Sequence, residues 1–488
     1  MESLTEIQKF YANKNILITG STGFIGQLLI DKLLRACPDI KRIYVIIRSK
    51  KGQTASERID SYFEKPIFDL LKNENPHYKS KLFGIIGDLT KPLLGLSDAD
   101  QELLQQNINI VIHAGATVGF LDKLQSSVKI NLIGTRDLFT FCKSFKNLEV
   151  FLYISSAYSN CPWKYVEEKI YDYPNTITWD RLASIVEILN ENELDTLTPH
   201  LLGNWPNTYC FSKAMTETML KESIDNKFPV VILRPGIVIS TAYEPVKGWA
   251  DNWQSPTGII AAFYTGYLKT MLINRKAETN LIPADMCAHA AIAAIWDGTK
   301  NRSSKELLRI YNYALPEKFF TWGNLMDYVI TLNKKYPISG GIGLWFIVCN
   351  TSRLKNNILQ LFLHTIPAYM IHGLLVLMGQ QPKIIRQYRR NQKQVDVVAY
   401  FCSQEWKFEN KNITALWDRL SDADKRIFKF SLKDIDWDSF MEVYILGVRK
   451  YLFKEDESTI PYAKKRRQMY VNFLNHSVLR FLCHFVPP

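Results

Sequence analysis

The stretch NILITGSTGFIGQLLIDKLLRACP (15–38) constrains the fold of this chain more than any other feature. Its first part, NILITG (15–20), is a short apolar run that enters a glycine, which is typical of a buried parallel strand. The residues that follow place apolar side chains at helical intervals until Pro38 ends the pattern. The sequence therefore predicts a strand, a glycine turn and a helix in immediate succession.

Gly20, Gly23 and Gly26 lie at three-residue intervals across this junction. In a dinucleotide-binding turn the first glycine permits the tight turn, the second lets the pyrophosphate approach the backbone, and the third lets helix and strand pack closely. The phosphates then lie at the positive end of the helix dipole. The glycines thus predict a dinucleotide site, with a purely structural turn as the alternative.

The next strand, IYVIIRSKKG (43–52), indicates which dinucleotide binds. Enzymes that select NAD usually carry Asp or Glu at the end of this strand, where it bonds the ribose hydroxyls. Here the strand ends in Arg48, followed by Lys50 and Lys51. These cations favour the 2′-phosphate of NADP(H), unless they form only a solvated basic loop.

Further strands are expected at LFGIIGDL (82–89), INIVIHAGA (108–116) and LEVFLYISS (148–156), with a helix over 127–143. This alternation predicts an α/β protein with a Rossmann-type, doubly wound parallel sheet. Asp88, at a strand end, is expected on the adenine side of the cofactor. His113 and the small residues Ala114, Gly115 and Ala116 are expected along the path to the nicotinamide.

A serine pair and a tyrosine–lysine pair predict the chemistry. The strand at 148–156 ends in Ser155 and Ser156, and Tyr209 and Lys213 share one helical face at positions i and i+4. Hydride addition to a carbonyl builds negative charge on its oxygen, which a donor must stabilise. Tyrosine has an unperturbed pKa of about 10, and a lysine cation lowers it. These residues predict a carbonyl-reducing site rather than a chance spacing.

Composition narrows the class of partner. The chain has 488 residues, 47% of them hydrophobic, and a net charge of +12, which favours anionic partners. No array of basic and aromatic residues indicates nucleic acid, so a phosphorylated small molecule or anionic lipid is expected. The eight cysteines are scattered without a CxxC pair, which predicts neither disulfides nor a metal site. The polar start predicts no cleavable signal peptide.

Taken together, these motifs resemble the extended short-chain dehydrogenase/reductases and, more narrowly, the alcohol-forming fatty acyl-CoA reductases, particularly those of insects. The similarity runs through almost the whole chain and includes GDLTKP, YISSAYSN, NWPNTYCFSKAMTE, VVILRPGIV and EPVKGWADNWQSPTG. It implies two hydride transfers from NADPH that convert a long-chain or very-long-chain acyl-CoA to an aldehyde and then to a primary alcohol, with release of CoA, as in wax biosynthesis. Ser156 or its neighbour Ser155, Tyr209 and Lys213 match the catalytic positions of the family.

The motifs and the resemblance together predict one cofactor-binding set and no metal ligands. The set comprises Gly20, Ser21, Thr22, Gly23, Phe24, Ile25, Gly26, Arg48, Lys51, Asp88, Leu89, His113, Ala114, Gly115, Asn131, Tyr209, Lys213, Pro235, Gly236 and Val238.

The chain departs from the family pattern at a few positions. The family more often has alanine at the position of Gly115, a polar residue at Gly119 and serine at Gly236, and its strand motif is commonly Ser-Thr. Serine keeps the hydroxyl, whereas the changes at Gly119 and Gly236 leave the substrate contacts open.

The second half of the chain contains a candidate membrane segment. Residues 356–382 include no Asp, Glu, Lys or Arg and are long enough to span a bilayer, which takes about 20 residues. They either enter a membrane or pack within a C-terminal helical domain. The basic run at 383–394 suits an anionic, cytosol-facing membrane surface or a solvated helix face. The basic and apolar tail from 463 onward suits a surface anchor or docking on the protein.

The predicted organisation is a reductase domain over 1–340, a smaller helical domain over 350–460 and a tail over 461–488. The expected location is the cytosolic face of a peroxisome or endoplasmic reticulum membrane. Two alternatives remain open: an extended dehydrogenase of a sterol or sugar-nucleotide alcohol, and an NADP-binding regulatory protein without turnover.

Overall fold

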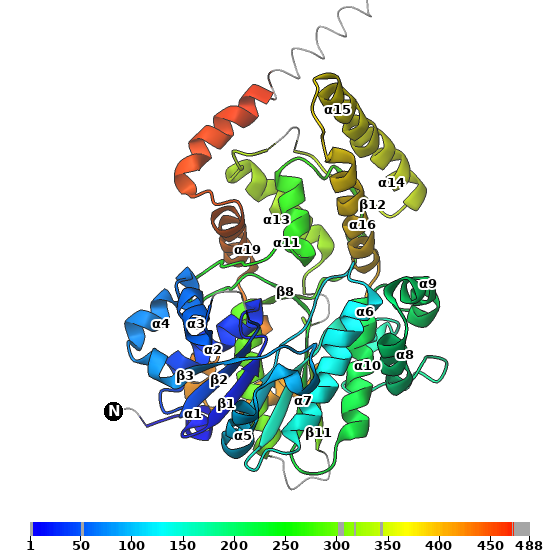
Figure 1. Cartoon of the computed structure of the whole chain (residues 1–488). Helices are drawn as coiled ribbons and strands as arrows, with labels where there is room; N and C mark the ends of the chain where they lie inside the picture. Colours follow the sequence, from blue (N-terminus) through cyan, green and yellow to red (C-terminus); the bar gives the residue numbers. More distant parts are fainter. Residues whose placement is uncertain are drawn as a thin grey trace, which may run out of the picture. The chain divides into compact units, whose positions relative to one another are not determined.

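The computed structural model describes residues 3–49, 53–300, 307–316, 319–341, 345–470 and 472 (Figure 1). By its internal contacts the chain divides into two units, each assembled from separate stretches of sequence. The first comprises Met1–Val246, Asn280–Glu317 and Trp406–Ile435, and the second comprises Lys247–Thr279, Lys318–Glu405 and Asp436–Pro488. The units are interleaved because the chain passes between them repeatedly. The linear domain ranges 1–340, 350–460 and 461–488 stay a prediction.

The first unit is built on a seven-stranded sheet in which every strand pairs in parallel with its neighbours. The strand order is β3-β2-β1-β4-β5-β7-β11. This confirms the predicted Rossmann-type α/β fold. The strands are β1 (Asn15–Thr19), β2 (Arg42–Ile47), β3 (Leu82–Ile86), β4 (Ile110–His113), β5 (Val150–Ile154), β7 (Val230–Pro235) and β11 (Leu308–Tyr313).

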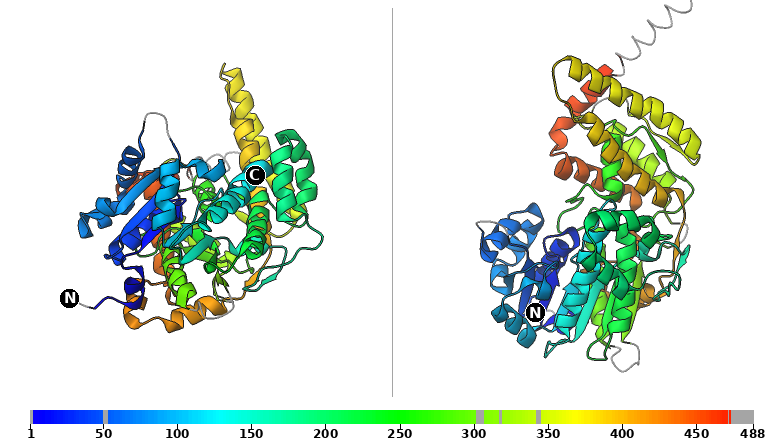
Figure 2. Two further views of the ribbon diagram at one scale, coloured as in Figure 1. Left: turned by 60° about the horizontal axis from the view of Figure 1, so that its bottom comes forward. Right: turned by 45° about the vertical axis from the view of Figure 1, so that its right-hand side comes forward.

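Helices lie on both faces of this sheet (Figures 1 and 2), so its central strands are buried throughout. Helix α2 (Phe24–Ala36) packs against α12 (Ala284–Lys300), and α7 (Gly134–Cys142) packs against α10 (Thr208–Ser223). The unit also contains α1 (Glu6–Tyr11), α3 (Ala55–Phe63), α4 (Asp69–Glu74), α5 (Asp98–Asn107), α6 (Leu124–Ser127), α8 (Trp179–Ile188), α9 (Glu191–Leu202), α17 (Lys411–Arg419), α18 (Asp422–Ile427) and the short strands β6 (Tyr165–Val166), β8 (Ile237–Ile239), β10 (Leu281–Pro283) and β13 (Lys407–Phe408).

The order of the strands determines where a ligand can bind. From β1 the chain builds the sheet outward through β2 and β3, and from β4 it builds in the opposite direction through β5 and β7. In open parallel sheets, ligands bind outside the carboxyl ends of the strands at such a switch point. The predicted site residues at the ends of β1, β4 and β5 therefore share one edge of the sheet.

The second unit is mainly helical. It contains a two-stranded parallel ladder between β9 (Thr270–Leu272) and β12 (Val348–Asn350). Its helices are α11 (Ser255–Tyr264), α13 (Trp322–Lys335), α14 (Arg353–Gln360), the π-helical turn η6 (Leu361–Thr365), α15 (Ile366–Leu377), α16 (Ile384–Ser403) and α19 (Trp437–Gly447). This agrees with the predicted C-terminal helical region.

Candidate active site

The glycine turn has the close contacts that its sequence predicts. Gly20 has a φ of +69°, and a Cβ atom there would lie 2.5 Å from the carbonyl carbon of Ala114, just beyond the end of β4. A Cβ atom on Gly26 would lie 2.2 Å from the carbonyl oxygen of Gly20. Only glycine fits at either position, so the turn lies against the end of β4 and the start of α2 lies against the turn.

A cleft of about 340 Å³ opens beside this turn at the carboxyl ends of β1, β2, β3 and β4. Within it, Asp88 accepts hydrogen bonds at 2.9 Å from the backbone N–H and the hydroxyl of Thr90. The predicted cofactor residues that line the cleft are Gly20, Thr22, Gly23, Arg48, Asp88, Leu89, Ala114 and Gly115.

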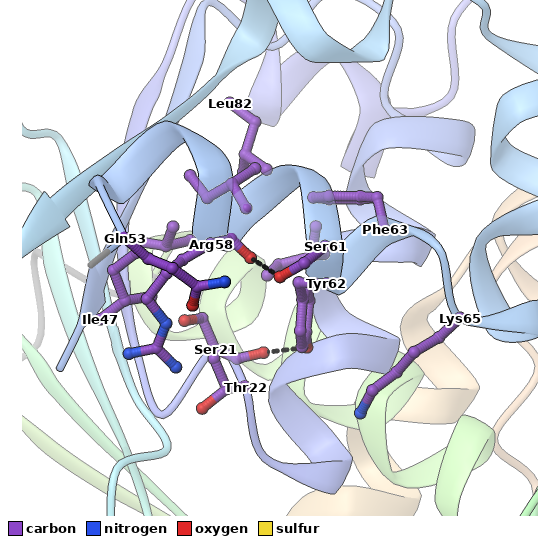
Figure 3. Close-up of a pocket in the computed structure, with 13 residues that line it drawn as sticks. Ser21, Thr22, Ile47, Gln53, Arg58, Ser61, Tyr62, Phe63, Lys65 and Leu82 are labelled. Carbon is purple, nitrogen blue, oxygen red and sulfur yellow. Dashed lines mark hydrogen bonds between the residues drawn. The ribbon is translucent and has the colours of Figure 1, made fainter. Parts of the chain in front are cut away.

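A second cavity of about 210 Å³ lies between the glycine turn and α3 (Figure 3). Ser21, Thr22, Gln53, Arg58 and Lys65 contribute polar groups to its lining. The Arg58 guanidinium donates a hydrogen bond to the carbonyl of Arg48, which ties α3 to the end of β2. Sequence reasoning missed both Arg58 and Gln53. Arg58 has the pattern of an ordinary surface charge on an amphipathic helix, and Gln53 is a polar residue just before that helix.

These features fit a nicotinamide dinucleotide. The Ser21 hydroxyl is buried and has no hydrogen-bond partner within the part of the chain that the structure describes. Gly20 and Gly23, which have no Cβ atom, lie in the same turn. The cationic side chains of Arg48, at the end of β2, and Arg58, on α3, line the two cavities. Lys51, another predicted contact, lies outside the described residues.

The predicted proton-donating residues meet where β5 ends against α10. Tyr209 lies in the first turn of α10, and its side chain lies close to that of Ser156, which acts to lower the pKa of the phenol. Lys213, one turn later, donates a hydrogen bond of 2.7 Å to the carbonyl of Ile154 and lies 4.4 Å from the centre of the Tyr153 ring. The ring centres of Phe120 and Tyr209 are 5.8 Å apart. Serine, phenol and ammonium thus gather at one edge of the sheet.

Burial shifts the pKa of both ionisable groups in this cluster. It raises the pKa of Tyr209, an effect that the neighbouring Ser156 partly opposes. It lowers the pKa of Lys213 to about 7, although the neighbouring Glu217 carboxylate acts in the opposite direction. The ammonium form of Lys213 therefore prevails below neutral pH.

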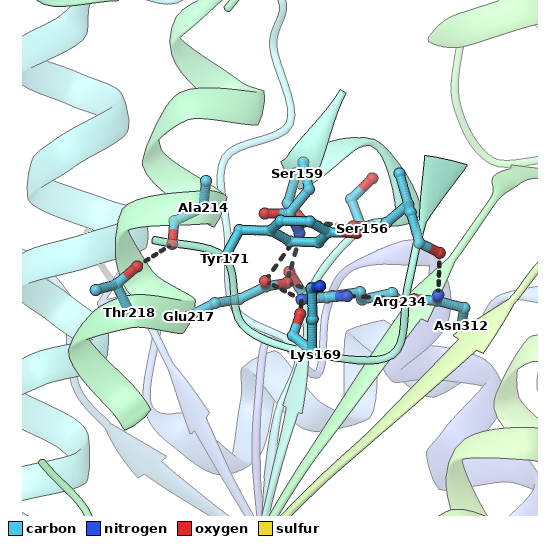
Figure 4. A network of polar contacts seen from close by, with 12 residues as sticks. Ser156, Ser159, Lys169, Tyr171, Ala214, Glu217, Thr218, Arg234 and Asn312 are labelled. Atoms are coloured by element: carbon cyan, nitrogen blue, oxygen red, sulfur yellow. Dashed lines mark hydrogen bonds and ion pairs between the residues drawn. The ribbon is translucent and has the colours of Figure 1, made fainter. Parts of the chain in front are cut away.

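The adjacent Ser155 contacts the buried ion pair of Glu217 and Arg234, which is shown in Figure 4. Its hydroxyl donates a hydrogen bond of 2.5 Å to Glu217, which forms a two-pronged ion pair with Arg234 at 2.9 and 2.6 Å. Glu217 and Arg234 are 1% and 0% exposed. Successive side chains of an extended segment point to opposite sides, so Ser156 lies beside Tyr209 while Ser155 bonds this ion pair.

The Glu217–Arg234 pair was not predicted as part of the site. Further bonds satisfy its remaining polar atoms: Asn160 and Ser159 donate to Glu217, and Arg234 donates to the carbonyls of Glu167 and Lys169. The sequence signal was present, because Glu217 follows Lys213 by one helical turn and therefore shares its face.

His113 and Asn131 hold the walls of the cleft by hydrogen bonds to the protein. The two ring nitrogens of His113 lie 2.6 Å from the Thr19 hydroxyl and 2.7 Å from the Thr135 hydroxyl. Burial, reinforced by Lys213, lowers the pKa of His113 to about 3, so its ring is neutral. Asn131 bonds both backbone groups of Thr117. Both residues thus support the cleft, and their contact with a cofactor stays a prediction.

The remaining predicted residues lie near the turn or at the end of β7. Phe24 and Ile25 begin α2. Pro235 is the last residue of β7, and Val238 lies in β8. Their contacts with a cofactor also stay predictions.

The two glycine departures have local explanations. A Cβ on Gly236 would lie 2.4 Å from the carbonyl oxygen of Asn280, which accepts a bond from the N–H of Ile237. At Gly119 a Cβ would meet the Asp122 carboxylate at 2.3 Å, and that carboxylate accepts a hydrogen bond from Thr117. In this chain a side chain at either position would therefore clash with these neighbours unless they moved.

Comparison with known proteins supplies independent findings. Two family models, both described as male sterility protein, match the chain: an NAD-binding model over residues 18–291 and a second model over residues 363–455. The chain is 36% identical over 461 residues to the fatty acyl-CoA reductase wat of Drosophila melanogaster, covering 94% of this chain and 88% of that protein. It is 33% identical over 467 residues to fatty acyl-CoA reductase 1 of Homo sapiens, covering 95% and 89% respectively.

Two solved structures share the fold. The terminal R domain of the myxalamid PKS-NRPS pathway gives a TM-score of 0.56 at 18% identity, covering 91% of this chain and 92% of that structure. The reductase domain of a nonribosomal peptide synthetase from Mycobacterium tuberculosis gives 0.58 at 16% identity, covering 90% and 92%.

Removing the buried carboxylate tests the ion pair. We expect Glu217→Ala to lower the free energy of unfolding by about 3–5 kcal/mol, because Arg234 then stays buried without a counter-charge. Denaturant titration measures this change. Glu191→Ala is the matched control, since it breaks an ion pair to Lys123 in which both side chains are about half exposed, and such pairs contribute about 0–1 kcal/mol. Equal effects of the two substitutions would contradict the assignment.

Proposed function

The chain belongs to the fatty acyl-CoA reductases, and from this premise we propose that it reduces long-chain fatty acyl-CoA to the primary alcohol through the aldehyde, with NADPH as cofactor. One arrangement carries the proposal: Ser156, Tyr209 and Lys213 gather at the carboxyl edge of the sheet whose glycine turn opens the dinucleotide cleft. A carbonyl held there meets hydrogen-bond donors where its oxygen gains negative charge.

Each side chain has a defined task in the two reductions. Ser156 and Tyr209 donate hydrogen bonds to the carbonyl oxygen of the thioester, which stabilises the tetrahedral adduct before the CoA thiolate leaves. In the second reduction Tyr209 gives its proton to the alkoxide formed from the aldehyde, and the Lys213 cation stabilises the phenolate that remains. NADPH, when bound, supplies one hydride to each reduction. None of these steps needs a covalent cysteine.

The choice of NADPH over NADH follows from the charges near the glycine turn. Arg48 lines the cleft, Arg58 lines the adjoining cavity, and the two are joined by a hydrogen bond. Asp88, the carboxylate in the cleft, lies at the end of β3 and is engaged with Thr90. Two guanidinium groups beside the end of β2 suit the 2′-phosphate, because arginine forms charge-assisted, bidentate bonds to phosphate.

The product assay separates this proposal from its rivals. Purified protein in detergent is given NADPH and acyl-CoAs of several chain lengths, and the products are analysed by gas chromatography. Fatty alcohol is the expected product. Release of CoA without alcohol would show that reaction stops at the aldehyde, oxidation of a sterol would support an extended dehydrogenase, and NADPH binding without turnover would support a regulatory protein.

Association with the cytosolic face of an organelle membrane, peroxisome or endoplasmic reticulum, completes the proposal. It is supported by one helix, Arg353–Leu377, that is long and apolar enough to cross a bilayer. The basic start of α16 follows directly. Long acyl chains and fatty alcohols themselves partition into lipid, so an enzyme at this surface meets its substrate where the substrate accumulates.

Loss of the phenol should abolish the chemistry and spare the cofactor. We expect Tyr209→Phe to lower kcat by about 10²–10⁴-fold, because the proton donor is removed. NADPH affinity, measured by fluorescence titration, should change little. The matched control is Tyr165→Phe, whose side chain is exposed. A Tyr209→Phe enzyme that retains near-normal alcohol formation would refute the catalytic assignment.

Cofactor preference tests the two arginines. The double variant Arg48→Ala/Arg58→Ala should raise KM for NADPH by about 10-fold or more, since each charge-assisted bond contributes roughly 1.5–3 kcal/mol. KM for NADH should stay nearly constant, because NADH has no 2′-phosphate. Arg181→Ala, an exposed arginine on α8, is the control. Parallel losses for both cofactors would contradict recognition of the 2′-phosphate.

The pH dependence follows from Lys213. Because the pKa of Lys213 is lowered to about 7, the ammonium is lost as pH rises through this value, and kcat/KM should fall by up to about tenfold per unit. Glu217→Gln removes the negative charge that raises this pKa, so the falling limb should move to lower pH. Initial rates across about pH 5.5–9 measure the shift, with Glu191→Gln as control. If the falling limb of the pH profile stays at the same pH in Glu217→Gln, the charge of Lys213 does not control kcat/KM.

A further inference from the structure

A continuous helix of 25 residues in the second unit presents an unusually apolar surface. Helix α14, the π-helical turn η6 and α15 together form Arg353–Leu377, in which only Asn356 and His364 are buried and every large apolar side chain is exposed or half-buried. Figure 1 labels the two parts of this helix α14 and α15. A helix buried in a protein core would show the opposite, so the apolar composition has another cause.

Large exposed side chains run the length of this helix. They recur at intervals of three or four residues, which places neighbours on a common side. Exposure is greatest at the two ends, 72% at Leu354 and 86% at Leu377. An apolar surface of this extent on a folded unit marks a contact with a partner or a membrane. The row, named here the apolar row, comprises Leu354, Ile358, Phe362, Ile366, Met370, Leu374 and Leu377.

The following helix, α16, lies against α15 and is strongly basic. The Thr365 and Tyr388 hydroxyls are 2.7 Å apart, and Arg389 donates a hydrogen bond of 3.0 Å to the Tyr369 hydroxyl. The first half of α16 exposes Arg386, Arg389, Arg390 and Lys393. The sequence has no Asp or Glu between Asp327 and Asp396, whereas the same stretch holds nine Lys and Arg residues.

The contacts between α15 and α16 argue against a helix that crosses the bilayer. Tyr369 lies near the middle of the apolar segment and is bonded to Arg389. If α15 crossed the membrane with this packing intact, Arg386, Arg389 and Arg390 would enter the hydrocarbon without acidic partners, which is strongly unfavourable. A helix that lies in the interface plane keeps these cations at the level of the headgroups.

We propose that α14, α15 and α16 form a monotopic docking surface for an anionic lipid leaflet. The apolar row enters the acyl chains of one leaflet, and the cations of α16 contact the lipid phosphates. A second copy of the chain is a poorer occupant, because two surfaces that each lack acidic residues over this stretch repel one another. The proposal specifies how the enzyme meets the membrane and does not depend on its catalytic chemistry.

Vesicle flotation with the full-length protein tests the docking surface. Wild-type protein should float with vesicles of phosphatidylcholine containing about 30% phosphatidylserine and bind pure phosphatidylcholine more weakly. Leu374→Glu/Leu377→Glu should reduce binding to the anionic vesicles by about tenfold or more, because two charges would enter the acyl region. Ile188→Glu, at a 79% exposed isoleucine of the first unit, is the matched control and should bind like wild type.

The same vesicles distinguish the lipid from other partners. Thermal unfolding of each variant verifies that the protein is folded, and turnover of a short, water-soluble acyl-CoA reports the reductase separately. Unchanged flotation of folded Leu374→Glu/Leu377→Glu would overturn the proposal. So would a wild-type protein that ignores both vesicles but forms a dimer that these substitutions abolish, since a second copy would then cover the row.

A labelled turn decides between docking and crossing. The turn between α15 and α16 includes Gln380, which is exposed. Gln380→Cys is labelled with a nitrobenzoxadiazole fluorophore in a Cys349→Ser/Cys483→Ser background and bound to preformed vesicles. Dithionite added outside should bleach the whole signal, because the turn stays in the outer leaflet. A protected fraction that is bleached only after detergent is added would show that the helix crosses the bilayer.

Discussion

A buried ion pair, Glu217 with Arg234, joins the three elements around the proposed catalytic residues. It links α10 to β7 directly and holds the end of β5 through Ser155. Two charges withdrawn from water persist only when their polar atoms are satisfied, and here serine, asparagine and backbone carbonyl groups satisfy them. With α10 held in this way, Tyr209 meets Ser156, and Lys213 rests on the carbonyl of Ile154.

The site must hold a polar dinucleotide and must also keep its proposed proton donor away from water. A dinucleotide needs backbone in close approach, which the turn achieves with glycine at positions 20 and 26. The proposed proton donor, Tyr209, needs a site away from water, and burial there lowers the pKa of the neighbouring Lys213 to about 7. Both requirements are met at the switch point of the sheet, because the carboxyl ends of the strands converge there while helices cover its two faces.

The two units differ in how they treat apolar surface. In the first, helices cover both faces of the sheet, so the apolar residues of its central strands are buried. In the second, Arg353–Leu377 leaves its apolar side chains exposed beside a basic helix. The proposed lipid leaflet is both apolar and anionic and would therefore match this surface, at a place where long acyl chains accumulate.

Patterns local in the chain predicted much of this protein. The run 15–38 predicted β1, the turn and α2, because a buried strand and an amphipathic helix are each recognised from the spacing of apolar residues along a short stretch of sequence. The YxxxK spacing placed Tyr209 and Lys213 on one face for the same reason. Contacts between distant residues were decided only by the tertiary structure: Ser156 rather than Ser155 as the partner of Tyr209, Arg58 beside Arg48, and Arg389 beside Tyr369. Periodicity records which side of an element is apolar, but which groups face each other depends on how the elements pack.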